Sequence, residues 1–297
     1  MSDKHAINGI ITAIITPFRE NKVDKKAYRQ LIEMQVNAGI SGVVPCGTTG
    51  ESATLDFDEH EMLIDYTLEL VNRRMTVIAG TGSNNTKEAI KLTEHAKKAG
   101  ADAALTITPY YNKPTQNGMY EHFKAIAEAV DIPLILYNVP GRTGVNILPE
   151  TVARLSEIKG IVGIKEATGS LQQVTEIIRQ SRKGFIVLSG DDFTALPSMA
   201  IGARGVISVT SNIVPAEMVG MFRAYESGDL QKAMDINLKL WPLHNAMFVE
   251  SNPIPVKAAA HLLGWISGEI RLPLTPLAGA NLEKLKTAMA GLGLIHG

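Results

Sequence analysis

The sequence predicts an α/β protein in which eight βα units close into a (β/α)8 TIM barrel, followed by a C-terminal helical appendage. Three observations favour this class. Short apolar runs rich in β-branched residues alternate with longer amphipathic stretches. The runs carry apolar residues at odd and even positions alike, as strands buried on both faces do. The linkers are mostly short, which suits right-handed crossovers between parallel strands.

Apolar runs that end in Gly, Pro, Asn or Asp are predicted as the eight barrel strands. They lie near 10–16, 42–46, 76–80, 103–108, 133–138, 161–166, 185–189 and 205–209. An open, doubly wound sheet is the alternative architecture. However, no glycine-rich dinucleotide-binding fingerprint follows the first run, which favours the closed barrel.

Amphipathic stretches between the strands are predicted as helices, with clear cases at 25–38, 58–73 and 86–99. Within the last of these, Thr86 is the expected N-cap and Gly100 the C-terminal stop. After residue 215 the strand pattern ends, and helices are predicted at 215–226, 229–248, 255–266 and 280–292. We therefore expect a catalytic barrel over 1–226 and a C-terminal helical domain over 227–297.

Composition narrows the function classes. Formal net charge is -1 and charged residues make up 20% of the chain, which predicts no nucleic-acid partner because such proteins usually carry a clustered basic surface. A single cysteine, Cys46, permits no intramolecular disulfide and favours a reducing compartment. The N-terminus lacks the apolar stretch of a signal peptide, and no run approaches the ~18 residues of a membrane span. We expect a cytoplasmic protein without a membrane partner.

Lys165 lies inside the predicted strand 161–166, where lysine is unusual unless it is paired. Alternation places Gly163 on the same face, where it would leave space beneath the lysine. Desolvation disfavours the charged ammonium, and a neutral amine is what a carbonyl-attacking nucleophile needs. Lys165 is therefore the candidate nucleophile. The alternative is a lysine paired with a structural carboxylate such as Glu166.

Tyr137 ends the strand that neighbours the lysine strand in a barrel, where a phenol could relay protons. A core tyrosine is the alternative. After the second strand, Gly47 and Gly50 flank Thr48 and Thr49, a pattern that can offer backbone N–H groups and hydroxyls to an anion such as a carboxylate. A helix-entry turn is the alternative there.

Two further loops carry candidate residues. Arg142 follows the fifth strand between glycines, which suits bidentate carboxylate binding, although a surface arginine is the alternative. Tyr110 and Tyr111 follow the fourth strand and serve either packing or contact with a neighbouring subunit. Asp191 and Asp192 follow the seventh strand, where we favour turn and capping roles. No histidine or acidic spacing indicates a metal site.

Six motifs in chain order, GTTGES, PYYNKP, YNVPGRTG, IKEATG, LSGDD and GVISVTSN, resemble the dihydrodipicolinate synthase family over essentially the whole chain. The segments SNPIPVKAA and RLPLTPL are similar too. The wider family includes acetylneuraminate lyase and related 2-keto-acid aldolases, which share the barrel and a pyruvate Schiff base. The threonine pair and the arginine motif fit the synthases better than the lyases, which remain the alternative activity.

The resemblance implies a lyase that joins pyruvate to L-aspartate 4-semialdehyde in the diaminopimelate route to lysine. It also implies no cofactor beyond the covalent pyruvate imine on Lys165, and a homotetramer built as two dimers. The implied catalytic residues are Lys165, Tyr137, Thr48 and Tyr111, the last acting from a partner subunit across a tight dimer. The implied substrate-binding residues are Thr49, Arg142, Gly190 and Ile207.

Many members of this family are inhibited by lysine between subunits. The matching positions here are Ser52, Ala53, Phe57, His60, Asn84, Glu88 and Tyr110. Phe57 departs from the histidine that enterobacterial members often carry, which weakens the expected inhibition. A non-catalytic ligand-binding regulator on the same fold is the alternative of another class. A buried nucleophile together with a proton relay, which a binder does not need, argues against it.

Overall fold

The computed structural model describes residues 7–296, in which eight parallel strands form a closed barrel in the order β1-β10-β9-β8-β7-β6-β5-β4. This confirms the predicted TIM barrel. The strands are β1 Gly9–Ala13, β4 Gly42–Val44, β5 Thr76–Gly80, β6 Ala103–Ile107, β7 Leu134–Asn138, β8 Ile161–Glu166, β9 Ile186–Ser189 and β10 Gly205–Ser208. Each predicted strand is present. Several are one to three residues shorter at one end than predicted, because the run of residues that suggested the strand extends beyond its hydrogen-bonded ladder.

One small sheet was missed by the sequence pattern. β2 Phe18–Arg19 and β3 Lys22–Val23 form an antiparallel pair around Glu20 and Asn21, both of which have positive φ. Two-residue strands are too short to show an alternation of apolar and polar residues. The hairpin therefore left no periodic signal in the sequence.

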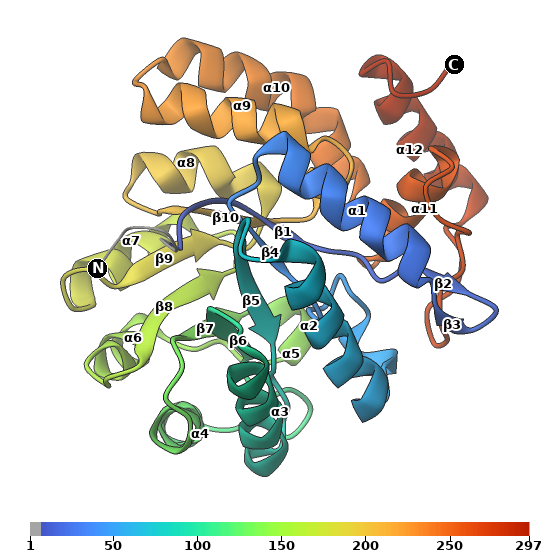
Figure 1. Ribbon diagram of the computed structural model, residues 1–297. Helices are drawn as coiled ribbons and strands as arrows, with labels where there is room; N and C mark the ends of the chain where they lie inside the picture. The colour runs from blue at the N-terminus through green and yellow to red at the C-terminus, as the bar shows by residue number, and fades with distance from the viewer. Residues whose placement is uncertain (1–6, 297) are drawn as a thin grey trace. The chain divides into compact units, whose positions relative to one another are not determined.

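The chain divides into two compact units. Within the described residues, the first unit contains 7–9 and 76–207. Its helices are α3 Thr86–Ala99, α4 Gln116–Ala129, α5 Pro140–Thr143, α6 Pro149–Ser156, α7 Leu171–Gln180 and α8 Ala195–Ala200. Figure 1 shows α3, α4, α6 and α7 outside strands β5–β9. Phe123, Ile126, Leu136 and Ile164 belong to the apolar core of this unit.

Helix α3 keeps its predicted bounds but not its predicted N-cap. Asn85 is the cap, and its side chain accepts a hydrogen bond from the Lys87 backbone N–H. Thr86 is instead the first helical residue, and its hydroxyl bonds His122. At the other end Gly100 adopts the left-handed conformation expected of a stop. Asn85 is the cap because its side-chain oxygen can reach the N–H of the second helical residue, whereas Thr86 already belongs to the helix.

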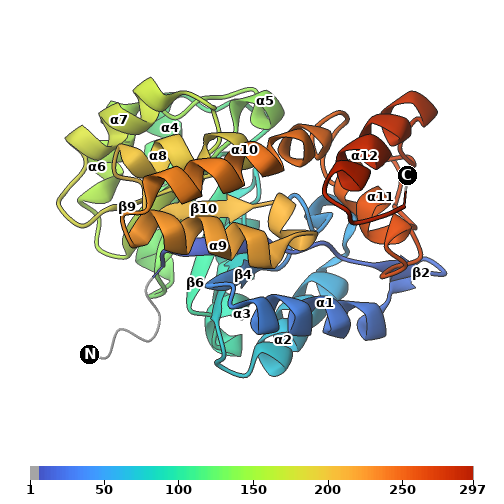
Figure 2. The ribbon, with the colours of Figure 1, turned by 90° about the horizontal axis from the view of Figure 1, so that it is seen from above.

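The second unit contains residues 10–75 and 208–296 of the described chain. Its helices are α1 Lys25–Ala38, α2 Phe57–Val71, α9 Pro215–Glu226, α10 Leu230–Ala246, α11 Ile254–Leu262 and α12 Gly279–Gly291. Figure 2 shows α9 and α10 side by side. Helix α12 packs on both α10 and α11. Helices α10, α11 and α12 form the predicted C-terminal appendage, while its treatment as a separate domain from residue 227 stays a prediction.

Candidate functional site

Strands β7 and β8 place Tyr137 and Lys165 side by side. The two residues are direct partners in the parallel register. Both are almost fully buried, at 7% and 5% exposure. The Lys165 Nζ lies 4.2 Å from the centre of the Tyr137 ring. An amine and a phenol thus meet in one buried space, as the sequence predicted.

The two glycines near Lys165 have different reasons to be glycine. A Cβ on Gly163 would lie 2.5 Å from the Ile186 backbone oxygen of strand β9. Gly163 therefore allows close strand approach, and the expected space beneath the lysine is wrong. A Cβ on Gly190 would lie 2.5 Å from the Ala167 Cβ and 3.1 Å from the Lys165 Cε. Gly190 therefore allows close approach of Ala167 first, and it also leaves room for the lysine side chain.

Glu166 is bound to amides and a backbone N–H, not held as the charge partner of the lysine. Its carboxylate accepts hydrogen bonds from Asn138 Nδ2 at 2.9 Å, the Thr168 backbone N–H at 2.9 Å and Gln173 Nε2 at 3.2 Å. Burial raises the pKa of Glu166, and these donors oppose the rise. Sequence reasoning missed this network, which ties the ends of β7 and β8 together. The alternative of a structural Lys165–Glu166 pair is therefore not supported.

Asp191 lies just beyond Gly190, next to the lysine strand. Burial raises the pKa of Asp191 to about 6, and the charge of Lys165 opposes the rise. It occupies the N-cap position of the short 3-10 helix Asp192–Thr194, but its side chain makes no capping hydrogen bond. The sequence drew attention to Asp191 because two acids follow a predicted barrel strand. The capping role expected for Asp191 is not observed.

The loops after β6 and β7 carry the other candidates of the first unit. Arg142 lies in helix α5 and is exposed. Next to it, Thr143 is buried and its hydroxyl bonds the Val139 and Val145 carbonyls. Tyr111 is 88% exposed with a φ of 69°, and Tyr110 is 39% exposed.

In the second unit, the loop after β4 is held as a set of tight turns. The N–H of Gly50 bonds the Gly47 carbonyl, and the N–H of Glu51 bonds the Thr48 carbonyl. Thr48 is half-buried, whereas Thr49 is 2% exposed. The Thr16 hydroxyl bonds the Gly50 carbonyl at 2.8 Å. Two hydroxyls are thus held on a rigid loop at the carboxyl end of a barrel strand, where active sites of this fold lie.

Two side chains from the C-terminal region bind this loop, and sequence reasoning gave neither a role. Asn252 Nδ2 donates to the Thr49 Oγ1 at 2.9 Å. The Lys257 Nζ pairs with the Glu51 Oε1, both side chains being buried. The Arg271 backbone N–H also bonds Glu51. The motif SNPIPVKAA contains both Asn252 and Lys257, but it contributed only to the family resemblance and indicated no role for either side chain.

The residues matched to a lysine site fall in both units. In the second unit, Ser52 and Ala53 lie in the 3-10 helix Ser52–Thr54, and Phe57 and His60 lie in α2. In the first unit, the Asn84 side chain donates to the Tyr110 carbonyl at 3.2 Å. There the Glu88 carboxylate accepts hydrogen bonds from Ser83 and Asn85. The role of these seven residues in lysine binding stays a prediction.

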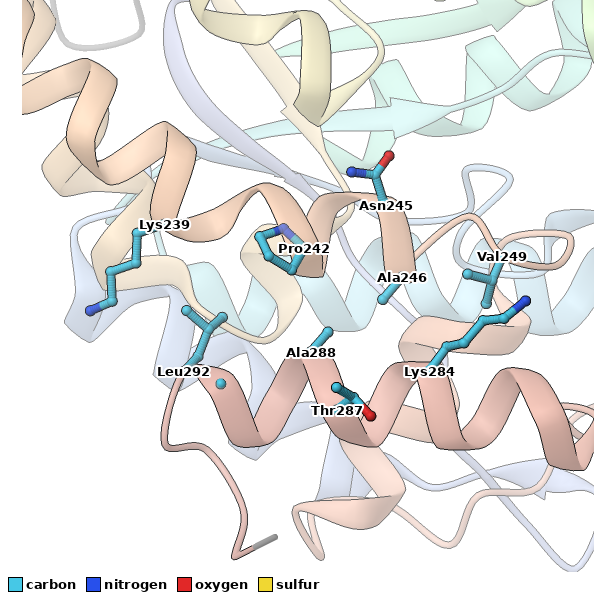
Figure 3. Close-up of a pocket in the computed structure, with 10 residues that line it drawn as sticks. Lys239, Pro242, Asn245, Ala246, Val249, Lys284, Thr287, Ala288 and Leu292 are labelled. Atoms are coloured by element: carbon cyan, nitrogen blue, oxygen red, sulfur yellow. The ribbon is translucent and has the colours of Figure 1, made fainter.

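A separate groove lies between α10 and α12 and encloses about 430 Å³ (Figure 3). Its walls are mostly apolar, with lysines at two places on its margin. The lining residues are Lys239, Pro242, Asn245, Ala246, Val249, Lys284, Thr287, Ala288, Gly291 and Leu292. None of the predicted site residues lines it, so this cavity is not the candidate active site.

The described residues provide neither a membrane-spanning helix nor a cluster of metal ligands. Among the helices within residues 7–296, none combines the length and apolarity that a membrane span requires. In the same part of the chain, no three His, Cys, Asp or Glu side chains gather closely enough to hold a metal ion.

Comparison with known proteins places the chain in a family. Residues 6–291 match the model of the dihydrodipicolinate synthetase family. The 4-hydroxy-tetrahydrodipicolinate synthase of Geotalea uraniireducens is 58% identical over 97% of this chain and 99% of that protein. The pyruvate-complexed, chloride-inhibited dihydrodipicolinate synthase of Acinetobacter baumannii is 50% identical, with a TM-score of 0.95, over 98% of this chain and 100% of that one. The lysine-bound dihydrodipicolinate synthase of Cyanidioschyzon merolae is 41% identical, with the same TM-score and coverage. The chain belongs to the dihydrodipicolinate synthetase family.

Proposed function

We propose that this protein is a 4-hydroxy-tetrahydrodipicolinate synthase, a Schiff-base lyase that condenses pyruvate with L-aspartate 4-semialdehyde. The observation that carries the proposal is the buried Lys165 amine beside Tyr137 at the ends of paired strands. The names of relatives at 55–58% identity support the choice of synthase over lyase. The reaction belongs to the biosynthesis of diaminopimelate and lysine.

The proposed chemistry begins with attack of the neutral Lys165 amine on C2 of pyruvate. The carbinolamine loses water and becomes an iminium, which draws electrons from the adjacent methyl group. Loss of a methyl proton produces an enamine, and its carbon attacks the aldehyde carbon of the semialdehyde. The semialdehyde amino group then adds to C2 and closes the ring, while the C2–nitrogen bond to Lys165 breaks. The iminium is the electron sink, so the sequence of steps calls for no further cofactor.

Proton transfers are assigned to hydroxyl groups. Tyr137 is the proposed general acid and base, because its ring contacts the nucleophile. Thr48 connects Tyr137 to Tyr111 of the partner subunit. In support of this, Tyr111 is 88% exposed within one chain and carries an otherwise unfavourable positive φ.

Substrate carboxylates are assigned to two places. The Thr49 hydroxyl, on its rigid loop, binds the pyruvate carboxylate together with the neighbouring backbone N–H groups. The exposed guanidinium of Arg142 binds the carboxylate of the semialdehyde. Gly190 and Ile207 line the pocket, Gly190 because the Lys165 side chain passes over it.

We further propose a cytoplasmic homotetramer built as a dimer of dimers, with inhibition by lysine between subunits. A lysine-bound relative supports the regulatory proposal. Glu88, already an acceptor of two hydrogen bonds, would hold the ammonium of the ligand, and Asn84 its carboxylate. Phe57 at the start of α2 is 46% exposed and supplies a ring where enterobacterial members carry histidine.

The test is borohydride reduction of the protein with pyruvate, followed by peptide mass spectrometry. The expected result is a reduced pyruvate adduct on Lys165 that is lost in Lys165→Ala. The exposed Lys183→Ala is the control variant and should keep the adduct. A well-folded wild-type protein that forms no adduct would contradict the proposal and favour a binding role.

A further inference from the structure

Helix α11 and the residues just before it make two contacts with the loop after β4, which carries Thr48 and Thr49; all of these residues belong to the second unit. Asn252 precedes the helix and donates to the Thr49 Oγ1 at 2.9 Å. Lys257 lies inside the helix and pairs with Glu51. Thr49 and Asn252 are 2% and 5% exposed, so solvent cannot easily replace this hydrogen bond. Two residues distant in sequence thus form one buried polar contact.

The direction of that hydrogen bond decides what the Thr49 hydroxyl can do. A threonine hydroxyl has one hydrogen to donate and two lone pairs to accept with. Because the Asn252 amide donates, it occupies one lone pair, and the hydroxyl hydrogen must point to another acceptor. The side chain is also β-branched and buried, so its rotamer is restricted. The hydroxyl is therefore preset as a donor.

We propose that Asn252 is a positioning residue that orients the Thr49 hydroxyl as a donor to the carboxylate of the 2-keto-acid substrate. This inference rests on the proposed function, in which Thr49 binds pyruvate. A hydrogen bond to a charged group is stronger than one between neutral groups. With Asn252 in place, an anion facing the Thr49 hydroxyl meets a donor that is already oriented. Without Asn252, the hydroxyl can also rotate to other directions, and the bond forms less often.

A purely structural role does not account for this contact. The loop backbone is already held by Thr16 on the Gly50 carbonyl and by Lys257 and the Arg271 N–H on Glu51. The Asn252 amide donates to a side-chain hydroxyl of the loop, whereas these three contacts are made to the Gly50 carbonyl and the Glu51 carboxylate. Its contribution therefore concerns the orientation of that hydroxyl.

Asn252→Asp is the sharpest test, because it keeps the shape and reverses the hydrogen bond. A carboxylate only accepts, so it would take the Thr49 hydrogen and place a negative charge near the substrate. We expect the pyruvate concentration that half-saturates adduct formation on Lys165 to rise about tenfold or more at high pH. The defect should shrink as the pH falls, because a protonated acid donates as asparagine does.

The surrounding charges are common to wild type and variant, so the difference in pH profile reports the new carboxyl. These groups are Lys257 and Glu51, with Arg271 and its partner Glu59. Asn245→Asp is the matched control, since it puts a carboxyl on exposed α10 in the same unit. It should leave half-saturation unchanged at every pH.

A second pair of variants decides the question even if Asn252→Asp does not fold. Asn252→Ala should raise half-saturation without a change in pH profile, but it should add nothing in a Thr49→Val background. Equal effects in both backgrounds would overturn the inference, as would a wild-type pH profile in a folded Asn252→Asp. If wild-type Lys165 forms the adduct but either of these two outcomes is found, only the inference about Asn252 fails. Absence of the wild-type adduct means that the proposed function fails.

Discussion

Replacement of Lys257 by methionine removes one half of an ion pair buried in the second unit. The Lys257 and Glu51 side chains are 2% and 0% exposed. Methionine keeps most of the side-chain volume, so the main loss is the cation that faces the Glu51 carboxylate. The Arg271 backbone N–H still bonds that carboxylate, at 3.2 Å. The variant therefore isolates the effect of an uncompensated buried charge.

The expected loss follows from this burial. Burial lowers the pKa of Lys257, and the charge of Glu51 opposes that change, so the pair is mutually compensated. Removal of one partner from a buried pair costs about 3–5 kcal/mol. The remaining N–H donor favours the lower end, about 3 kcal/mol. The melting temperature should then fall by roughly 5 °C for a chain of this size.

Urea and thermal unfolding, followed by circular dichroism at one protein concentration, measure this loss. Lys286→Met is the control, because the Lys286–Glu283 pair on α12 is solvent-exposed and should change stability within error. The double variant Lys257→Met with Glu51→Gln should recover most of the loss, since no charge is left unpaired and the glutamine oxygen can still accept from the Arg271 N–H. A single variant no worse than the control, or a double variant no better than the single, would refute the reasoning.

Three further predictions concern the candidate site. Arg142→Ala should raise the KM for the semialdehyde about tenfold or more while the pyruvate adduct still forms, with only partial rescue by Arg142→Lys because the bidentate fork is lost; an unchanged KM counts against the assignment. Gly190→Ala should slow adduct formation, because the added Cβ would lie 2.5 Å from the Ala167 Cβ and 3.1 Å from the Lys165 Cε, so that the segment carrying the lysine has to shift. Gly279→Ala, which meets nothing within 4 Å, should not, and equal rates in stopped-flow assays would contradict this. Burial raises the pKa of Asp191 from 3.8 to about 6, so the folded state binds this proton more tightly and loses stability as the pH rises through 6. Asp191→Asn should therefore be more stable than wild type by about 1–3 kcal/mol at pH 7, and the gain should vanish below about pH 4. Urea titrations across this range check it, and a difference independent of pH would be the contrary result.

Local sequence patterns predicted the barrel well for a physical reason. Strands buried on both faces leave continuous apolar runs, and helix α3 leaves a 3.6-residue period, so both can be recognised without a partner. The polar interruption at Lys165 was equally visible, because a lysine within such a run is rare. The predicted N-cap of α3 was wrong by one residue. Asn85 and Thr86 are both residue types that cap helices, and only the backbone conformation shows which of them is the cap.

The glycine beside the lysine shows where local reasoning ends. Gly163 shares a strand face with Lys165, which suggested space for the side chain. In the structure, its constraint comes from Ile186 on the neighbouring strand. The same limit hid the acceptor role of Glu166, because two of its donors, Asn138 and Gln173, come from β7 and α7.

By itself, the sequence determined the order of the eight barrel strands and the place of a buried lysine near the end of one of them. The tertiary structure alone decided which side chains support the site. Asn252 lies 203 residues from Thr49 along the chain, and Lys257 lies 206 residues from Glu51. No periodic pattern records such a contact, because it depends on where the chain returns after the barrel is built. Hydrogen-bond partners at that distance are products of packing, whereas strands and helices are products of local spacing.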